Sequence, residues 1–117
     1  MSLAAQCLFC KIIRREIPAD IVYEDDYALA FRDIRPVAPV HALVIPKVHI
    51  ESVTVATAEH SEILGRTLLA AGEVARKLGV VDGGYRLVVN NGADAGQSVF
   101  HIHVHVLGGR GLAWPPG

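Results

Sequence analysis

Hydrophobic residues recur along the chain with different spacings, and each spacing predicts a different kind of element. Over residues 58–78 the apolar positions return every three or four residues and form one stripe, which predicts a long amphipathic helix that ends at Gly79. Similar spacing over residues 8–16 predicts a short first helix, which Pro18 stops. Shorter apolar runs bounded by turn-forming residues predict β-strands in the rest of the chain.

Five extended segments are expected. The first two flank the polar turn 24–26 and are typical of a hairpin, and the third ends at Pro46, which cannot continue a central strand. The expected strands cover residues 21–23, 28–31, 41–45, 85–90 and 100–107. Together with one long and one short helix, they predict an α+β fold with a five-stranded, mainly antiparallel sheet.

Length and composition narrow the picture further. A chain of 117 residues, 51% hydrophobic, suits a single domain over residues 1–117 with one core. The net charge of −1 argues against a polymeric nucleic acid as partner. No apolar run resembles a secretion signal or approaches the roughly 20 residues of a membrane span, so we expect a cytoplasmic protein that does not contact a membrane.

The last ten residues, 108–117, are too rich in glycine and proline for a helix or a central strand. They nevertheless contain Trp114, the single tryptophan of the chain. A large aromatic side chain in such a segment favours a tail that docks, and a partner subunit is one candidate surface. The alternative is a mobile tail whose tryptophan has no role.

Three histidines alternate with apolar residues near the end of the chain. If residues 100–107 form a strand, then His101, His103 and His105 share one face, and the residues between them face the core. Imidazole nitrogens need polar partners, and the ring titrates near neutral pH. Such a row therefore indicates a functional site rather than packing.

The histidine row, with Gly96-Gln97-Ser98 before it, resembles the signature of the histidine triad (HIT) superfamily. Other segments are similar to its Hint branch, whose members bind nucleotides; they are Ile12–Pro18, Ala30–Ile34, Pro39–Lys47, Tyr85–Asn90 and Trp114–Gly117. The resemblance implies a HIT-like homodimer. It also implies a hydrolase that cleaves purine nucleoside 5′-phosphoramidates, in which a purine mononucleotide is joined to an amine, through a nucleotidyl-histidine intermediate.

The resemblance also implies catalytic roles. A neutral imidazole is a good nucleophile for phosphorus, and its attack splits one hydrolysis into two easier steps. The resemblance gives this role to His103, while His105 and Ser98 bind the phosphate and the loop at Gly96 offers backbone N–H groups. His41 is similar to an accessory histidine of the family that orients the triad or relays protons. Alternatively, His41 is a structural histidine.

A nucleotide site is implied in the same way. Asp33 would accept hydrogen bonds from the ribose hydroxyls, and Asn90 would lie on the phosphate and leaving-group side. Considered without the family, the apolar residues of the set would be assigned to the core, and Asn90 to a turn. The full predicted set is Phe9, Ile12, Ile17, Phe31, Asp33, Ile34, Leu43, Asn90, Gly96, Gln97, Ser98, His103, His105 and Trp114.

The pair Cys7 and Cys10 resembles the Cys-x-x-Cys of bacterial HIT proteins, which implies a zinc ion held together with His49 and His101. Two thiolates and two imidazoles complete a tetrahedral set, which is typical of structural zinc. A Cys-x-x-Cys pair also occurs as a redox pair or as two buried thiols. No organic cofactor is implied.

Three other functions remain open. In the first, the three triad histidines bind one catalytic metal ion, although rings two residues apart on a strand are about 6.6 Å apart and converge on one ion with difficulty. In the second, the chain is a non-catalytic nucleotide-binding or adaptor protein. The third is a dinucleoside polyphosphate hydrolase, which fits less well because Gln97-Ser98 and the tail resemble the Hint branch.

Overall fold

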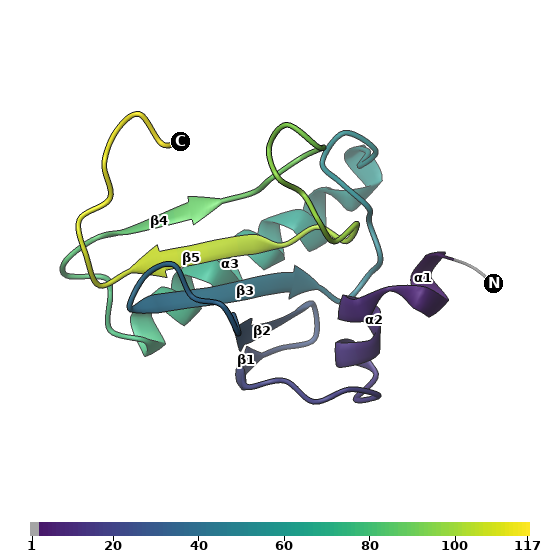
Figure 1. Cartoon of the computed structure of the whole chain (residues 1–117). Coiled ribbons are helices and arrows are strands. Elements are labelled where there is room, and N and C mark those ends of the chain that lie inside the picture. The colour runs from purple at the N-terminus through teal and green to yellow at the C-terminus, as the bar shows by residue number, and fades with distance from the viewer. Residues whose placement is uncertain (1–2) are drawn as a thin grey trace.

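A five-stranded antiparallel sheet forms the centre of the computed structural model, which describes residues 3–117 (Figure 1). The strand order is β1-β2-β3-β5-β4, and every neighbouring pair is antiparallel. The predicted α+β fold is therefore confirmed. The strands are β1 (Ile21–Glu24), β2 (Ala28–Arg32), β3 (Val40–Pro46), β4 (Tyr85–Val88) and β5 (Val104–Gly108).

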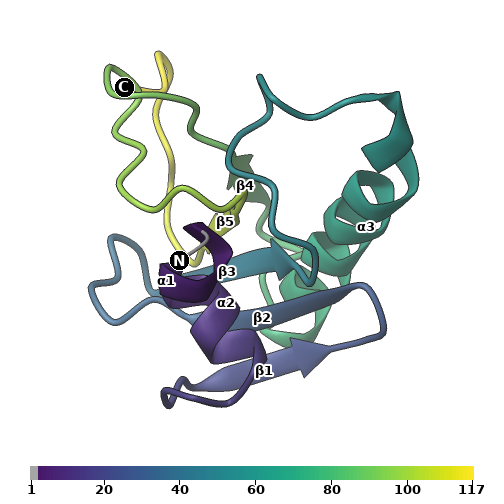
Figure 2. The ribbon, with the colours of Figure 1, turned by 90° about the vertical axis from the view of Figure 1, so that its right-hand side faces the viewer.

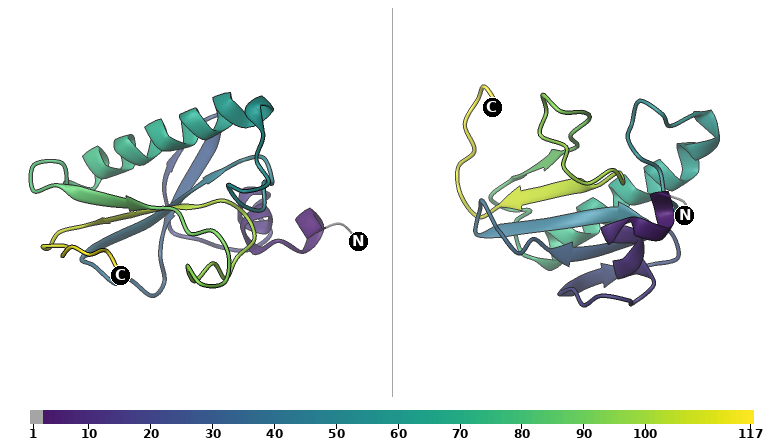
Figure 3. Two further views of the ribbon diagram at one scale, coloured as in Figure 1. Left: turned by 90° about the horizontal axis from the view of Figure 1, so that it is seen from above. Right: turned by 45° about the vertical axis from the view of Figure 1, so that its right-hand side comes forward.

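Helices lie on both faces of the sheet. The long helix α3 (Ser61–Lys77) follows the 3₁₀ turn η1 (Ala58–His60) and covers one face (Figure 2). The N-terminal helices α1 (Leu3–Gln6) and α2 (Leu8–Ile13) lie away from α3, beside the other face (Figure 3). The helix predicted over residues 8–16 corresponds to α2, which ends at Ile13 and is therefore shorter than expected. Cys7 is the N-cap of α2, because its Sγ accepts the N–H of Cys10 at 3.4 Å.

Alternation along the strands creates two separate hydrophobic clusters. Small and β-branched side chains, including those of Ala30 and Val44, pack under α3. Their larger neighbours Phe31 and Leu43 point the other way, toward α2. In β5 the valines belong to the α3 side, so His105 lies on the α2 side of the sheet. The candidate site therefore lies on the face that the two N-terminal helices share.

The histidine segment differs from its prediction. The strand β5 begins at Val104, so His101 and His103 precede it, and the expected strand over 100–107 is partly wrong. The N–H of Ile102 bonds instead to the carbonyl of Ile50, at 2.7 Å, in the segment after β3. The strand β4 likewise ends at Val88, two residues before the predicted end.

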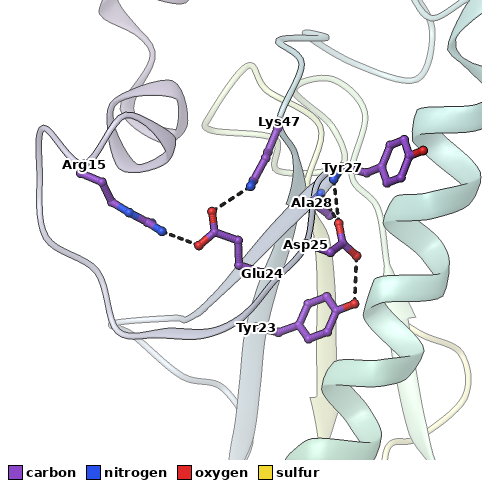
Figure 4. A network of polar contacts seen from close by, with 7 residues as sticks. All are labelled: Arg15, Tyr23, Glu24, Asp25, Tyr27, Ala28 and Lys47. Carbon is purple, nitrogen blue, oxygen red and sulfur yellow. Dashed lines mark hydrogen bonds and ion pairs between the residues drawn. The ribbon is translucent and has the colours of Figure 1, made fainter.

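The β1–β2 hairpin has the predicted turn, and Asp25 holds it together (Figure 4). One carboxylate oxygen of Asp25 accepts the backbone N–H groups of Tyr27 and Ala28, at 2.7 and 2.8 Å. The other oxygen accepts the hydroxyl of Tyr23 at 2.9 Å. This is the side chain to backbone bonding that favours aspartate in turns.

Glu24, in the hairpin, connects the turn after α2 to the end of β3. Its carboxylate pairs with Lys47, at 2.8 Å, and with Arg15 (Figure 4). Arg15 has a left-handed backbone, with φ of 62°, and ends the turn after α2. The ion pairs hold the α2 exit and the β3 exit against the hairpin.

Within residues 3–117, no helix combines the length and the apolar character needed to cross a bilayer.

Candidate active site

A cleft of about 500 Å³ opens between α2, the adjacent strands and the segment before β5. This volume lies in the range of roughly 300–1,000 Å³ that is typical of small-molecule sites. Its walls are mainly apolar, and Asp33 and two triad histidines contribute polar groups. Ten residues of the predicted nucleotide set line it, namely Phe9, Ile12, Ile17, Phe31, Asp33, Ile34, Leu43, Ser98, His103 and His105.

Four predicted residues are not among those that line the cleft. The N–H of Gly96 bonds to the carbonyl of Ala93, and Gln97 is buried inside its own loop. The Gln97 amide accepts the N–H of Gly92 and donates to the carbonyl of Glu51, at 2.9 and 2.8 Å. Gln97 therefore shapes the loop. Asn90 is half-buried beyond the end of β4.

Trp114 is the fourth of these residues, and its side chain is 80% exposed. The tail before it is held by Arg86, whose guanidinium donates to the carbonyls of Leu112 and Ala113 at 3.2 and 2.9 Å. The same guanidinium lies 5.9 Å from the centre of the Trp114 ring. The tail is thus anchored on its own chain, whereas its tryptophan faces outward.

Several residues of the cleft were not predicted. Leu8, Pro18, Ala19 and Val99 extend the apolar wall, and Asp20, Arg32 and Arg35 add charge near the mouth. Pro18 and Ala19 could have been predicted to line the cleft because they follow Ile17 directly. The others have no sequence signal of their own, because their position depends on how the segments pack.

His103 is held in one tautomer. Its Nδ1 lies 2.8 Å from the carbonyl oxygen of His101, which only accepts hydrogen bonds, so Nδ1 carries the proton. Nε2 is then the nitrogen with the free lone pair. The ring of Phe9 meets the imidazole edge-on, with centroids 5.1 Å apart. The arrangement leaves an oriented imidazole at the cleft, whose neutral form has its lone pair on Nε2.

His41 and His105 form a second oriented pair. The N–H of Val37 donates to His41 Nδ1 at 3.1 Å, so the proton of neutral His41 is on Nε2. His41 Nε2 donates to His105 Nδ1 at 2.9 Å, and a carboxylate oxygen of Asp33 lies 3.4 Å from His41 Nε2. His105 therefore carries its proton on Nε2. This nitrogen is buried and has no hydrogen-bond partner.

Burial keeps this pair neutral. Desolvation lowers the pKa of His105 to about 4, and the nearby histidines act in the same direction, opposed by the charge of Asp33. Desolvation also lowers the pKa of His41, again against Asp33. At neutral pH both rings are therefore uncharged, and His105 offers an N–H donor at the cleft.

The predicted metal ligands come together beside the cleft. The sulfur atoms of Cys7 and Cys10 lie 3.4 and 3.5 Å from His101 Nδ1, and Cys10 Sγ lies 3.3 Å from His49 Nδ1. Ligand atoms at the corners of a zinc tetrahedron are about 3.3–3.8 Å apart. All four ligand atoms lie within 4.8 Å of one another, so this set fits a tetrahedral ion.

The protonation of His101 suits a ligand. Its Nε2 lies 2.9 Å from the carbonyl oxygen of Pro46, so Nε2 carries the proton and Nδ1 directs its lone pair toward the sulfur atoms. Burial lowers the pKa of His101 to about 4, which keeps the ring neutral. Burial and the neighbouring Cys7 raise the pKa of Cys10 to about 11. A cation is the group that would stabilise the thiolate there.

The three triad histidines thus have different surroundings. His101 belongs to the cysteine cluster, His103 bonds to a backbone carbonyl, and His105 belongs to a group with His41 and Asp33. Within residues 3–117, the three rings do not form one ligand group. The alternative of a single catalytic metal on all three histidines is therefore not supported by the geometry.

The chain belongs to the family of HIT domain proteins, because the family model matches residues 14–112. An uncharacterized HIT-like protein of Synechococcus elongatus is 57% identical over 115 residues, which cover 98% of this chain and all of the relative. A purine nucleoside phosphoramidase of Escherichia coli K12 is 51% identical over 110 residues, covering 94% of this chain and 92% of that protein.

Solved structures agree with this assignment. A HIT family hydrolase from Legionella pneumophila superposes with a TM-score of 0.92 at 52% sequence identity, covering 95% of this chain and 99% of that one. A HIT family hydrolase from Clostridium thermocellum gives 0.88 at 50% identity, covering 92% and 93%. The resemblance predicted from the histidine motif is therefore confirmed, and the chain is a member of the HIT family.

Proposed function

We propose that the protein hydrolyses purine nucleoside 5′-phosphoramidates. The observation that carries the proposal is the His103 tautomer, since Nδ1 is tied to a backbone carbonyl and a lone pair remains on Nε2 at a cleft of nucleotide size. The relative that is named a purine nucleoside phosphoramidase supports this substrate class.

The reaction proceeds in two displacements at phosphorus. His103 Nε2 forms a bond to the phosphorus atom, and the bond from phosphorus to the amine nitrogen breaks, so the amine nitrogen takes the electron pair and a proton from solvent. The oxygen of a water molecule then bonds to phosphorus, the imidazole leaves with the electron pair, and a proton of the water returns to solvent as the nucleoside monophosphate forms. The carbonyl of His101 accepts a hydrogen bond from Nδ1–H throughout and stabilises the positive charge on the nucleotidylated ring.

The remaining residues bind the nucleotide. The unpartnered His105 Nε2–H and the Ser98 hydroxyl donate to phosphate oxygens as negative charge develops. Asp33 accepts from the ribose hydroxyls, and the apolar walls on Phe9 and Ile12 hold the base. His41 fixes the tautomer of His105.

Mass spectrometry of the intact protein tests this mechanism. After brief incubation with an adenosine phosphoramidate, the wild type is expected to carry one adenylyl group, and His103→Asn is expected to carry none while it still binds the nucleotide. His60 lies outside the cleft, where its ring caps the turn before α3 by accepting the N–H of Thr57. His60→Asn is therefore the matched control and is expected to form the adduct. Equal turnover by His103→Asn would refute the mechanism.

Binding measurements and a comparison of two substrates separate the alternatives. Nucleotide binding without adduct or turnover would identify a non-catalytic binding or adaptor protein. Faster cleavage of a dinucleoside polyphosphate than of the phosphoramidate would instead identify a dinucleoside polyphosphate hydrolase.

We further propose that the Cys7, Cys10, His49 and His101 cluster binds a structural zinc ion. The support is the spacing of the four ligand atoms and the protonation of His101. Four protein ligands form a closed set, so the ion would stabilise the fold rather than supply a reactive water. Both cysteines are free thiols, which suits the predicted cytoplasmic location.

A homodimer is the predicted state of assembly. The strand β4 ends the sheet, which leaves one of its edges open, and Leu68 and Leu69 of α3 expose more than half of their surface. One helical turn later, Gly72 faces Tyr85 of β4, so the open edge and the exposed leucines adjoin. Sedimentation velocity tests the proposal. The wild type should sediment as a dimer and Leu69→Glu as a monomer, whereas a monomeric wild type would contradict the proposal.

A further inference from the structure

A continuous set of hydrogen bonds leads from the root of the tail to the cleft. The Arg110 guanidinium donates to the carbonyl of Val37 through Nε at 3.3 Å and Nη2 at 2.9 Å. The N–H of the same Val37 donates to His41 Nδ1 at 3.1 Å. His41 then donates to His105, whose Nε2–H has no partner in the cleft. Arg110 thus lies at the far end of a set of bonds that orients two imidazole rings.

The position of Val37 needs an external anchor. Residues 33–39 leave the sheet as a loop, closed at its base by the N–H of Asp33 bonding to the carbonyl of His41 at 2.9 Å. Val37 is 60% exposed, so its own side chain contributes little packing to hold it in place. The segment before Arg110 passes close to the loop, since a Cβ on Gly109 would lie 2.8 Å from Pro39 Cβ. Arg110 is the side chain that clamps Val37 from this segment.

We propose that Arg110 is a positioning residue, which holds the Val37 N–H on His41 and so sets the tautomers of His41 and His105. The effect on catalysis rests on the proposed function, whereas the effect on the tautomers does not. The Arg110 guanidinium bonds to the carbonyls of Val37 and Gly111, and Arg110 is not among the residues that line the cleft, so it would act through Val37.

The consequence of losing the clamp follows from the hydrogen-bonding rules of imidazole. Without the Val37 donor, the Nδ1 lone pair of neutral His41 loses its partner, and only the Asp33 carboxylate, 3.4 Å from Nε2, still favours the proton on Nε2. A fraction of His41 would therefore carry its proton on Nδ1. Its Nε2 lone pair would then face the Nδ1 lone pair of His105, across the present 2.9 Å. His105 would relieve this repulsion by moving its own proton to Nδ1. The cleft would then lose the Nε2–H that donates to the phosphate.

Nitrogen-15 NMR of the histidine rings tests the proposal directly. The variants are Arg110→Met and Arg110→Gln, which remove the clamp, and Arg110→Lys, which keeps a donor and a charge. The His41 signals are assigned by comparison with His41→Asn. The matched control is Arg86→Met, which releases the tail carbonyls of Leu112 and Ala113 but does not touch Val37. Steady-state rates with an adenosine phosphoramidate are measured on the same samples.

We expect His41 in the wild type, in Arg110→Lys and in Arg86→Met to show a protonated Nε2 and an unprotonated Nδ1. Both clamp-free variants should show a mixture of tautomers. Their kcat should fall on the order of fivefold to tenfold, the effect of one lost hydrogen bond, with KM changed less than about twofold. Arg110→Lys should recover most of this rate.

An unchanged His41 tautomer in both clamp-free variants would overturn the proposal, whatever the rates. The same tautomer change in Arg86→Met would also overturn it, because displacement of the tail would then be the cause. If the wild type lacked phosphoramidase activity, the proposed function would fail while the NMR comparison still decided the role of Arg110. Two clamp-free variants are used so that the result does not depend on the folding of one.

Discussion

The ring of His103 bonds to the backbone carbonyl of His101, with 2.8 Å between Nδ1 and the oxygen. The ring of His101 itself belongs to the cysteine cluster. One residue therefore contributes its side chain to the candidate metal centre and its backbone to the orientation of the proposed nucleophile. The geometry of the candidate metal centre and the orientation of the His103 ring are therefore linked through two residues that are only two positions apart.

Zinc should stabilise the fold through this cluster. Adding zinc to metal-stripped protein is expected to raise the free energy of unfolding by about 4 kcal/mol when free zinc is about 1,000 times its dissociation constant. Urea titrations with and without zinc measure this difference. Cys10→Ser should lose most of the gain. An equal gain in Cys10→Ser would show that zinc acts elsewhere.

Asp33 should determine the preference for ribose. One of its carboxylate oxygens accepts the N–H of Arg35 at 2.8 Å, and the other lies 3.4 Å from His41 Nε2 at the cleft. Asp33→Asn is expected to raise KM for ribonucleoside substrates about tenfold, since the amide is a weaker acceptor than a carboxylate. Steady-state kinetics with matched ribose and 2′-deoxyribose substrates measure this preference. The exposed Asp26→Asn is the control, and a preserved preference in Asp33→Asn would contradict the assignment.

Protonation of His105 should couple stability to pH. Burial lowers the pKa of His105 from 6.5 to about 4 in the folded protein. Between these values the unfolded chain binds a proton that the folded chain does not, so the free energy of unfolding falls as the pH is lowered from 6.5 to 4. Above pH 6.5 neither state binds this proton, and below pH 4 both states bind it. Outside this range His105 therefore no longer makes the free energy of unfolding depend on pH.

Urea titrations of metal-free protein across this pH range measure the coupling. His105→Asn is expected to show a slope that is shallower by one proton, even if its overall stability differs. His101 contributes equally to both proteins, so the difference in slope reports His105. Identical slopes would show that His105 titrates normally in the folded state.

Gly108 should tolerate no side chain. A Cβ at this position would lie 2.7 Å from two carbon atoms of Val80, so Gly108→Ala is expected to reduce the free energy of unfolding by about 1–3 kcal/mol. Thermal or urea unfolding measures the effect. Gly65, in α3, has open space where a methyl group would lie, and Gly65→Ala should instead stabilise by about 0.5–1 kcal/mol. A neutral Gly108→Ala would show that Val80 moves aside easily.

Local patterns in the sequence predicted the elements well where the chain follows regular periodicity. The stripe over 58–78 became η1 and α3, and the hairpin turn at Asp25 was recognisable from its residue types. The start of β5 was misplaced because alternation alone cannot show where a segment begins to pair. That start depends on the bonds that residues 101–103 make to segments far away in the chain, such as the one to Ile50.

The site shows the same division. The motif resemblance proposed His41, His103, His105 and the four candidate metal ligands, and the structure brings His41 beside His105 and the four ligands into one cluster. It also placed Gln97 and Gly96 at the nucleotide, whereas in the structure Gly96 bonds within its loop and Gln97 joins this loop to the carbonyl of Glu51. The contribution of Arg110 had no signal in the sequence, because it acts through the backbone of Val37.

The sequence by itself determined which side chains are available and the family to which the chain belongs, because side-chain chemistry and periodicity are local properties. The tertiary structure alone decided the tautomers, since a ring nitrogen holds or lacks a proton according to the group opposite it. For His101, His103 and His41 these groups are backbone atoms of Pro46, His101 and Val37. Every residue has such atoms, and only the folded arrangement of the chain determines which of them meets a histidine.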